Sequence, residues 1–456
     1  MNNSNFNFIM TQSSENEKKF YNLQGEVGYP ILGEASQLFS KNQYFWLERF
    51  YRYGSIFKTR IFNMNAVCLA EPDAYKLILK DEAHKFSSNQ GWWVLKPFFE
   101  RGLLLQDGQE HQRSKRLISP AFTRGSLAHS RKNIEETVER YLIEHIENEK
   151  IFSPLPFFRK LTLLIICRLI LGYEQDQEQK VNKLSQLFLD VLAGVSSVVR
   201  LNMPLTKYRK ALQANEDLQN YLILIISERR QNKLLSGSSS LLDILLEQRE
   251  QDGDYLLDRE IASQISAIFF GGHETTANLL CSSLVQLEYN TSWQEKLRSE
   301  LKQNSSKSFL SFYNDSLFNN IINECLRLNP PIYTIPRKVI KSFEVADCKV
   351  PEGWYIILSP LLTHRIPYLY SDPEAFDPLR FSPPREEHKK HPFGFISFGG
   401  GAHKCIGQDL VMLELEIILT YLLREYFWKS HNQFEYLEFL RHTAKCIKLL
   451  KISLYS

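Results

Sequence analysis

The segment Phe398-Gly-Gly-Gly-Ala-His-Lys-Cys405-Ile-Gly407 surrounds one cysteine with glycines and positive charge. A thiolate is the metal-binding form of cysteine, and a helix N-terminus or a nearby cation favours it. His403 and Lys404 bring positive charge close to Cys405, and a helix-forming run follows at residues 408–423. The glycines allow tight turns and close approach to a flat cofactor. The segment therefore predicts a cysteine that is prepared to ligate a metal.

The competing interpretation is that Cys405 is an ordinary small core residue, as most single cysteines are. The spacing argues against it, because Phe-x-x-Gly-x-His-x-Cys-x-Gly resembles the haem-binding signature of the cytochrome P450 family. The resemblance implies that Cys405 is the axial ligand of a haem b iron. It also implies that Phe398, Gly401 and Gly407 contribute to the cofactor site and that His403 contacts a haem propionate. Most family members have arginine at that basic position, so His403 is a departure from the pattern.

Length and composition are compatible with one such enzyme domain. The chain has 456 residues, of which 43% are hydrophobic and 12% aromatic, enough for a core and an apolar pocket. A net charge of +3 gives no electrostatic reason to expect nucleic acid as a partner. We expect residues 1–20 to be a polar, disordered N-terminus and residues 21–456 to form a single cytochrome P450 domain.

The cysteines and the N-terminus bear on the compartment. Seven scattered cysteines with no Cys-x-x-Cys pair speak against a disulfide framework or structural zinc and favour a reducing cytosol. The first 19 residues lack the apolar stretch of a signal peptide or membrane anchor. We therefore expect a cytoplasmic, monomeric protein of the soluble bacterial type, without a transmembrane anchor; a peripheral membrane contact through an apolar loop stays open.

The chain pattern predicts a mainly α protein with a small β region. Strands are expected at residues 55–62 and 66–70, helices dominate from about 74 to 328, and strands return between 337 and 358. The proline-rich residues 372–384 cannot form a regular helix. The resemblance implies the cytochrome P450 fold, with an α-helical lobe around a long central helix and a smaller β-rich lobe.

A second chemical site is expected in the longest apolar helical pattern, which runs from Arg259 to about Leu287 with a cap at Asp258. Its middle reads Gly271-Gly-His-Glu-Thr-Thr276, and glycine and threonine are poor choices for a helix interior. A threonine can bond back to a carbonyl one turn earlier and kink the helix. Taken alone, the segment could equally be a helix packed closely on a neighbour.

The order Gly-Gly-x-Glu-Thr-Thr is similar to the oxygen-activation motif of the same family. The resemblance implies that Glu274 and Thr275 form a proton relay to dioxygen, which needs protons before its O–O bond breaks. His273 occupies the variable position of the motif. We expect it to be a packing or surface-facing residue and not a ligand.

Three further residues resemble a structural signature of the family. Glu324 and Arg327 form a Glu-x-x-Arg pair, which alone would be a commonplace helical ion pair. The family signature implies that both bind Arg380, in Pro378-Leu-Arg-Phe381, and so hold the cysteine loop in place.

Four cations are candidates for binding the haem propionates. Arg337 and His403 stand where family members often use basic residues. His111 and Lys115 lie one helical turn apart, so they share a face. The usual family pair at these two positions is Trp and Arg, and a solvated helix face competes with the cofactor role for Lys115.

An apolar cavity over the haem is expected to take an elongated lipophile. A plain core position is an equal alternative for each of its aromatic residues. The expected lining is Trp92, Trp93, Phe269, Gly271, Ile332, Tyr333 and Thr334. Residues 28–34 and 56–62 resemble the branch that includes retinoic acid hydroxylases, so a retinoid, another isoprenoid or a fatty acid would suit.

The sequence thus predicts a haem-thiolate monooxygenase that uses dioxygen and receives electrons from a separate ferredoxin or flavodoxin. Lys389, Lys390, His391 and Lys404 could form a basic docking face for such a donor, although a solvated surface is the commoner explanation of charge runs. Two alternatives remain. One is a peroxygenase or isomerase on the same fold, and the other is a non-catalytic haem-thiolate sensor or carrier.

Overall fold

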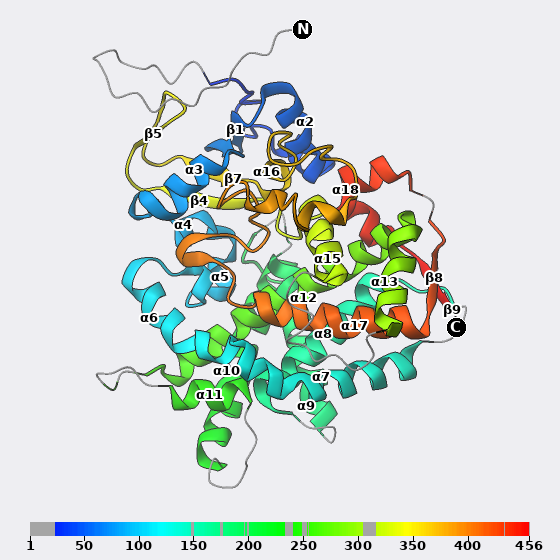
Figure 1. Cartoon of the computed structure of the whole chain (residues 1–456). Coiled ribbons are helices and arrows are strands. Elements are labelled where there is room, and N and C mark those ends of the chain that lie inside the picture. Colours follow the sequence, from blue (N-terminus) through cyan, green and yellow to red (C-terminus); the bar gives the residue numbers. More distant parts are fainter. Residues whose placement is uncertain are drawn as a thin grey trace.

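The computed structural model describes residues 23–146, 150–173, 177–195, 197, 200–232, 240–248, 253, 255–303, 316–432 and 434–455. The N-terminal segment 1–20, for which disorder was expected, lies outside these residues. Helices form most of the described chain, most strands gather in one region on the N-terminal side, and β8 and β9 lie apart from them near the C-terminus (Figure 1). The predicted mainly α fold with a small β region is confirmed.

The longer helices carry the bulk of the molecule. They are α1 (Ala35–Lys41), α2 (Gln43–Tyr53), α6 (Gly108–Ile118), α7 (Arg124–His145), α8 (Pro154–Leu171), α9 (Glu178–Val195), α10 (Lys207–Asn232), α11 (Leu241–Glu247), α12 (Asp258–Tyr289), α13 (Thr291–Gln303), α15 (Leu317–Leu328), α17 (Gln408–Glu425) and α18 (Tyr436–Leu449). Short helices are α3 (Pro72–Lys76), α4 (Ser88–Gly91), α5 (Lys96–Phe99) and α16 (Pro360–Thr363). No helix in the described ranges is both long and apolar enough to cross a membrane.

The main sheet joins segments that are far apart in the sequence. Its strand order is β1-β2-β7-β4-β3, and two further strand pairs are β5-β6 and β8-β9. The strands are β1 (Ile56–Ile61), β2 (Met64–Leu69), β3 (Phe86–Ser87), β4 (Ile335–Val339), β5 (Phe343–Val345), β6 (Cys348–Val350), β7 (Tyr355–Leu358), β8 (Phe427–Ser430) and β9 (Ile452–Tyr455). The predicted hairpin is the antiparallel pair β1-β2, and β2 then pairs in parallel with β7. The sheet thus ties the start of the chain to the segment that precedes the cysteine loop.

Helix α12 runs through the middle of the molecule, between the sheet region and helices α7, α9, α10 and α11 (Figure 1). It contacts α8, α10, α15, α17 and α18, and most of its apolar residues are buried. Its 32 residues correspond to a length of about 48 Å at 1.5 Å per residue. The helix is continuous through Gly271–Thr276, so the expected kink does not interrupt it.

The predicted cap of α12 is wrong by one residue. Asp258 is the first helical residue, and Leu257 is the N-cap. The Leu257 amide donates to Glu260 Oε2 at 2.7 Å, so the acid three residues later supplies the capping acceptor. Asp258 instead binds Arg230 Nε of α10 at 2.7 Å. The carboxylate of Asp258 therefore joins two helices.

Four charged residues form a buried ion cluster between α15 and the proline-rich segment. Arg327 donates to both oxygens of Glu324 at 2.7 and 2.8 Å, and Arg380 Nε donates to Glu324 Oε1 at 3.0 Å. Arg380 Nη1 also donates to Glu387 Oε2 at 2.7 Å. None of the four side chains is more than 4% exposed. The expected bond between Glu324 and Arg380 is present, whereas Arg327 is connected to Arg380 through Glu324. Glu387 is a fourth member that sequence reasoning missed.

The ion cluster connects to the cysteine loop through His364. Arg327 Nη1 donates to the His364 carbonyl at 2.8 Å, and His364 Nδ1 lies 3.2 Å from the Arg327 carbonyl. The other ring nitrogen, Nε2, accepts from the Ile396 amide at 3.1 Å, so the ring proton must be on Nδ1. Burial lowers the pKa of His364 to about 3, which agrees with a neutral ring. A continuous set of hydrogen bonds therefore runs from the ion cluster to the segment just before Cys405.

Removing one charge from the ion cluster should destabilise the protein strongly. Glu324→Gln leaves Arg327 and Arg380 buried with too little negative charge, and the free energy of unfolding should fall by about 3–5 kcal/mol in urea titrations. Glu136→Gln is the control, because Glu136 pairs with Lys132 at 3.7 Å on the exposed surface. The control should change stability by at most about 0.5 kcal/mol. Equal effects of the two substitutions would contradict a structural role for the cluster.

Candidate active site

Cys405 lies between the short 3-10 helix at Gly401–His403 and the start of α17. It is exposed, whereas the other six cysteines are buried. Its amide donates to the Phe398 carbonyl at 2.9 Å, which closes the loop, and Gly407 is the N-cap of α17. Although solvent reaches the surface of Cys405, the surrounding protein desolvates the thiol and raises its pKa, while the Gly407 amide and nearby lysine charges oppose this shift. A bound metal cation would deprotonate such a thiol outright.

Two glycines are required by the backbone of this loop. Gly399 and Gly401 have φ values of +70° and +64°, which lie in the left-handed region that favours glycine. A Cβ on Gly401 would stand 2.0 Å from the carbonyl oxygen of Leu79, so no side chain fits there. The predicted tight turns are confirmed at both positions.

His111 and Lys115 of α6 both reach the cysteine loop. The rings of His111 and His403 lie face to face, with centroids 4.0 Å apart and planes inclined by 37°. Lys115 Nζ donates to the carbonyl of Ala402. The side chain of Lys115 therefore contacts the loop that carries Cys405 while it stays partly exposed.

Arg337 on β4 completes a cationic cluster with His403, His111 and Lys115. Its guanidinium is buried, and burial lowers the pKa of Arg337 to about 10. Burial and the neighbouring cations lower the pKa of His403 to about 2 and that of His111 to about 4. In the described part of the chain, Asp107 is the one carboxylate near these groups, with Oδ1 4.0 Å from His403 Nε2. Such a surplus of buried donors fits an additional anion, and the two propionates of a haem would supply it.

Glu274 and Thr275 lie together on α12, but Glu274 has a partner that the sequence did not reveal. Arg159 of α8 binds both carboxylate oxygens, with its Nε 2.6 Å from Oε2, and Asn278 Nδ2 lies 3.1 Å from Oε1. Burial alone would raise the pKa of Glu274, but the hydrogen bonds and charge of Arg159 lower it below its usual value. Glu274 is therefore ionised at neutral pH. Thr275 Oγ1 donates back to the Gly271 carbonyl, as predicted.

His273 is a core residue. Its side chain has no exposed surface, and its ring meets Phe188 edge to face at 5.6 Å. Burial lowers the pKa of His273 to about 4, so the ring is neutral. Of the two expectations for this residue, packing is confirmed and a surface-facing position is wrong, because α12 is surrounded by other helices.

Several of the expected pocket residues border open space. Gly271 is exposed, and a Cβ placed on it would meet nothing within 4 Å. Trp93 and Ile332 are about two-fifths exposed, and Trp92 and Thr334 are partly buried. All five residues thus keep exposed surface that a ligand could contact.

Two other expected pocket residues lie elsewhere. Phe269 has no exposed surface and packs edge to face on Phe188, with centroids 5.8 Å apart. Tyr333 packs on the apolar cluster beside α2 and β1. Because one residue turns a helix by about 100°, the partly buried neighbour Phe270 points another way and stacks on Phe99 at 4.8 Å. Phe270 is thus better placed than Phe269 to border a cavity.

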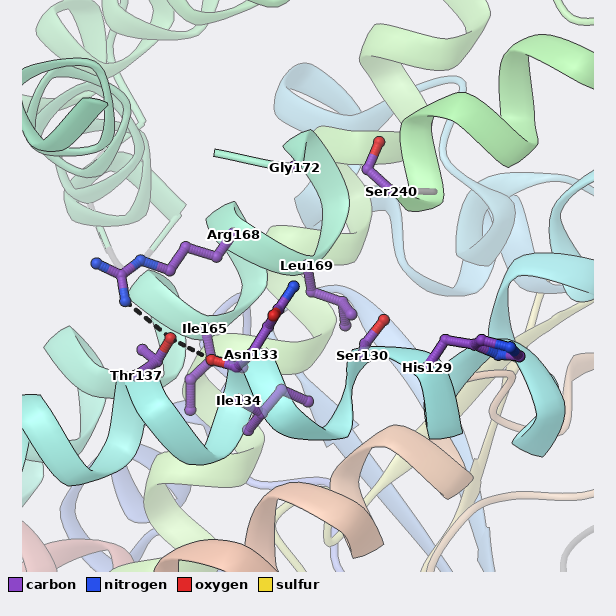
Figure 2. A pocket seen from close by; sticks show the side chains of 10 residues that line it. All are labelled: His129, Ser130, Asn133, Ile134, Thr137, Ile165, Arg168, Leu169, Gly172 and Ser240. Carbon is purple, nitrogen blue, oxygen red and sulfur yellow. Dashed lines mark hydrogen bonds between the residues drawn. The ribbon is translucent and has the colours of Figure 1, made fainter. Parts of the chain in front are cut away.

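A separate hollow of about 240 Å³ lies between α7, α8 and the start of α11 (Figure 2). It is lined by polar groups, among them Thr137 and Arg168, whose side chains are hydrogen bonded at 2.8 Å. None of the residues predicted for the haem or substrate sites lines it. This hollow is distinct from the site around Cys405.

Residues 23–445 match the cytochrome P450 family model. The chain belongs to the cytochrome P450 family. It is 30% identical to cytochrome P450 136 of Mycobacterium tuberculosis, over 88% of this chain and 82% of the relative. It is 29% identical to abscisic acid 8'-hydroxylase 4 of Arabidopsis thaliana, over 89% of this chain and 86% of that protein.

A solved structure described as retinoic acid bound cyanobacterial CYP120A1 is similar throughout. Its TM-score is 0.82, its sequence is 26% identical, and the match covers 95% of this chain and 99% of that one. The predicted family, fold and cofactor are confirmed: the protein is a cytochrome P450 monooxygenase that uses haem b. Haem supplies the iron at which dioxygen is activated.

Removing Arg159 should change the protonation of Glu274. In Arg159→Leu the cation that keeps the carboxyl ionised is lost, burial dominates, and the pKa of Glu274 should rise so that it takes up a proton near neutral pH. Infrared spectra at pH 7 should then show an additional carboxylic acid C=O band. The double variant Arg159→Leu/Glu274→Gln should lack this band, and a single variant with a wild-type spectrum would refute the pairing.

Proposed function

We propose that Cys405 is the axial thiolate ligand of the haem iron. One observation carries this assignment: the exposed cysteine stands at the head of α17 beside two neutral histidines and the cations Arg337 and Lys115, against which the described residues set only the Asp107 carboxylate. The thiolate would bind the iron, while Arg337, His403, His111 and Lys115 would hold the propionates. Phe398, Gly401 and Gly407 would set the shape of the loop.

The substrate that we propose is an elongated lipophile, namely a retinoid, another isoprenoid or a fatty acid. Support comes from the likeness to the retinoic acid bound structure and to the abscisic acid hydroxylase, whose named molecules are both isoprenoid carboxylic acids. Open space beside Gly271, with Trp93 and Ile332 partly exposed, suits an apolar molecule. The product would be a hydroxylated form of the same molecule.

Glu274 and Thr275 are proposed to carry protons toward the site of oxygen activation. The Thr275 hydroxyl can pass a proton at Oγ1, and the ionised Glu274 carboxylate can accept one from solvent when Arg159 releases it. The presence of both the acid and the threonine favours a monooxygenase over a peroxygenase, an isomerase or a non-catalytic carrier.

The function is tested by a substrate screen followed by turnover. Retinoids, terpenoids and fatty acids are titrated against the haem-loaded protein, and a true substrate should shift the spin state of the iron. With that substrate, dioxygen and reduced ferredoxin, Thr275→Ala should divert most electrons from product to hydrogen peroxide, and Thr275→Ser should restore coupling. Binding without product in the wild type would favour the carrier.

Replacing Cys405 should abolish thiolate ligation. Cys405→Ser should lose the thiolate-type spectrum of the ferrous carbonyl form, because a hydroxyl is a far weaker ligand. Cys348→Ser, at a buried cysteine on β6, should keep that spectrum. A normal thiolate-type spectrum from Cys405→Ser would disprove the assignment.

We propose that the electron donor is a ferredoxin or flavodoxin, and that the protein works as a monomer in the cytoplasm. Lys404 lies in the cysteine loop and Lys390 lies ahead of it in the sequence; both are exposed and would attract an acidic donor. Lys389 is less available, because it pairs with Glu386.

Charge reversal tests this docking face. Lys390→Glu/Lys404→Glu should raise the apparent Michaelis constant for reduced ferredoxin several-fold at low salt and less at high salt. Lys132→Glu on α7, where the side chain is highly exposed, is the control and should have no effect. An unchanged constant at low salt in the double variant would remove the proposal.

A further inference from the structure

Glu414 is a buried carboxyl group that the activity described so far does not use. It lies on α17, nine residues after Cys405, and it has no exposed surface. Neither of its carboxylate oxygens has a hydrogen-bond partner among the residues that the structure describes. Buried polar groups are nearly always hydrogen bonded, and a buried charge is costly unless it is paired. The position therefore calls for a physical explanation.

The groups that face Glu414 do not neutralise a negative charge. From α12 the neighbouring group is the hydroxyl of Thr276, which is also fully buried and directly follows Thr275. Among the described residues, Thr276 Oγ1 has no hydrogen-bond partner that satisfies normal geometry. The hydroxyl offers Glu414 a polar contact but no charge.

The cations on the other helices against α17 are engaged elsewhere. Arg131 of α7 binds Glu416 at 2.9 Å, and Arg124 of α7 lies 3.5 Å from Asp409. Arg298 of α13 donates to the carbonyl of Leu423. In the described structure no cation shifts the pKa of Glu414. Burial and the Thr276 hydroxyl are the two causes of its shift.

Burial raises the pKa of Glu414 to about 8, and the Thr276 hydroxyl acts in the opposite direction. At neutral pH the group is mostly an uncharged acid. Glu274, on the preceding turn of α12, is ionised because Arg159 compensates its charge. The two carboxyl groups near Thr275 and Thr276 thus differ in protonation at neutral pH: Glu414 holds a proton and Glu274 is ionised.

We propose that Glu414 couples the reduction of the haem site to the uptake of one proton. The inference rests on the proposed ligation by Cys405, because α17 begins three residues after Cys405, at Gln408, and Glu414 lies about 9 Å along this helix. An electron that arrives at the iron site adds a negative charge, which repels a carboxylate through a poorly screened interior. One electron comes from the donor protein, and one proton from solvent binds the Glu414 carboxylate. The iron site takes up the electron, and no other group of the protein is oxidised or reduced.

The proposal fixes the direction in which the reduction potential should change with pH. Well below pH 8 Glu414 keeps its proton in both redox states, so it does not affect the reduction potential. Near and above pH 8 the oxidised protein has released the proton and reduction restores it. The potential should then fall with rising pH by up to about 59 mV for each tenfold drop in proton concentration.

The experiment is a spectroelectrochemical titration of the haem-loaded full chain between pH 6 and 10. Wild type should show an additional negative slope near and above pH 8, and Glu414→Gln should lack it because the amide cannot titrate. Glu416→Gln is a matched control, since Glu416 lies on the same helix but is paired with Arg131. It should keep the wild-type slope. Equal slopes in wild type and Glu414→Gln would overturn the proposal.

A second variant covers the case in which Glu414→Gln does not bind haem. Thr276→Val removes the hydroxyl that lowers the pKa of Glu414, so the additional slope should begin at a higher pH. An onset that does not move would count against the proposal.

Unfolding experiments separate this proposal from the ligation by Cys405. An acid whose pKa is raised by folding contributes stability that is lost as pH rises toward 8, so wild type should lose more stability than Glu414→Gln between pH 6 and 9. Parallel losses would show that Glu414 does not titrate. Failure of Cys405 ligation would appear instead as a missing thiolate-type carbonyl spectrum.

Discussion

The buried ion cluster of Glu324, Arg327, Arg380 and Glu387 is the constraint on which the candidate site depends. It brings α15 against a proline-rich segment whose regular structure is a single 3-10 turn at Pro378–Phe381, and its arginines donate to backbone carbonyls of this segment. Charges in a poorly screened interior must be paired with good geometry, so the cluster permits one arrangement of this segment. His364 connects the cluster to the chain before Cys405, because its carbonyl binds Arg327 and its ring binds the Ile396 amide.

Around the candidate haem site, chemically similar groups differ in protonation because their surroundings differ. Glu274 is partly buried and paired with an arginine, whereas Glu414 is fully buried and has no arginine partner, so their pKa values move in opposite directions. The histidines at 111 and 403 remain neutral among cations, while Arg337 keeps its charge. The residues proposed for proton supply, propionate binding and iron ligation thus occupy distinct regions around one loop and two helices.

The features that could be predicted from the sequence are those set by short spacings. The glycines at 399 and 401 are needed by a local backbone turn, and the bond from Thr275 to Gly271 spans a single helical turn. Pairings across the fold were harder to find. Arg159 is 115 residues from Glu274, and nothing in its neighbourhood of the sequence marks it. The orientation of Phe269 was also missed, because a shift of one residue on a helix selects a different neighbour.

By itself, the sequence determined the family, the mainly α fold, the haem cofactor and the segment that holds Cys405, because motif spacing and helical or strand periodicity are properties of a continuous chain. Only the tertiary structure decided which charges are compensated. In the folded structure Arg159 pairs with Glu274, and Lys115 binds the cysteine loop. The polar neighbour of Glu414 is the uncharged hydroxyl of Thr276. Protonation and ion pairing depend on distance and burial in three dimensions, and these are not encoded in any local stretch of residues.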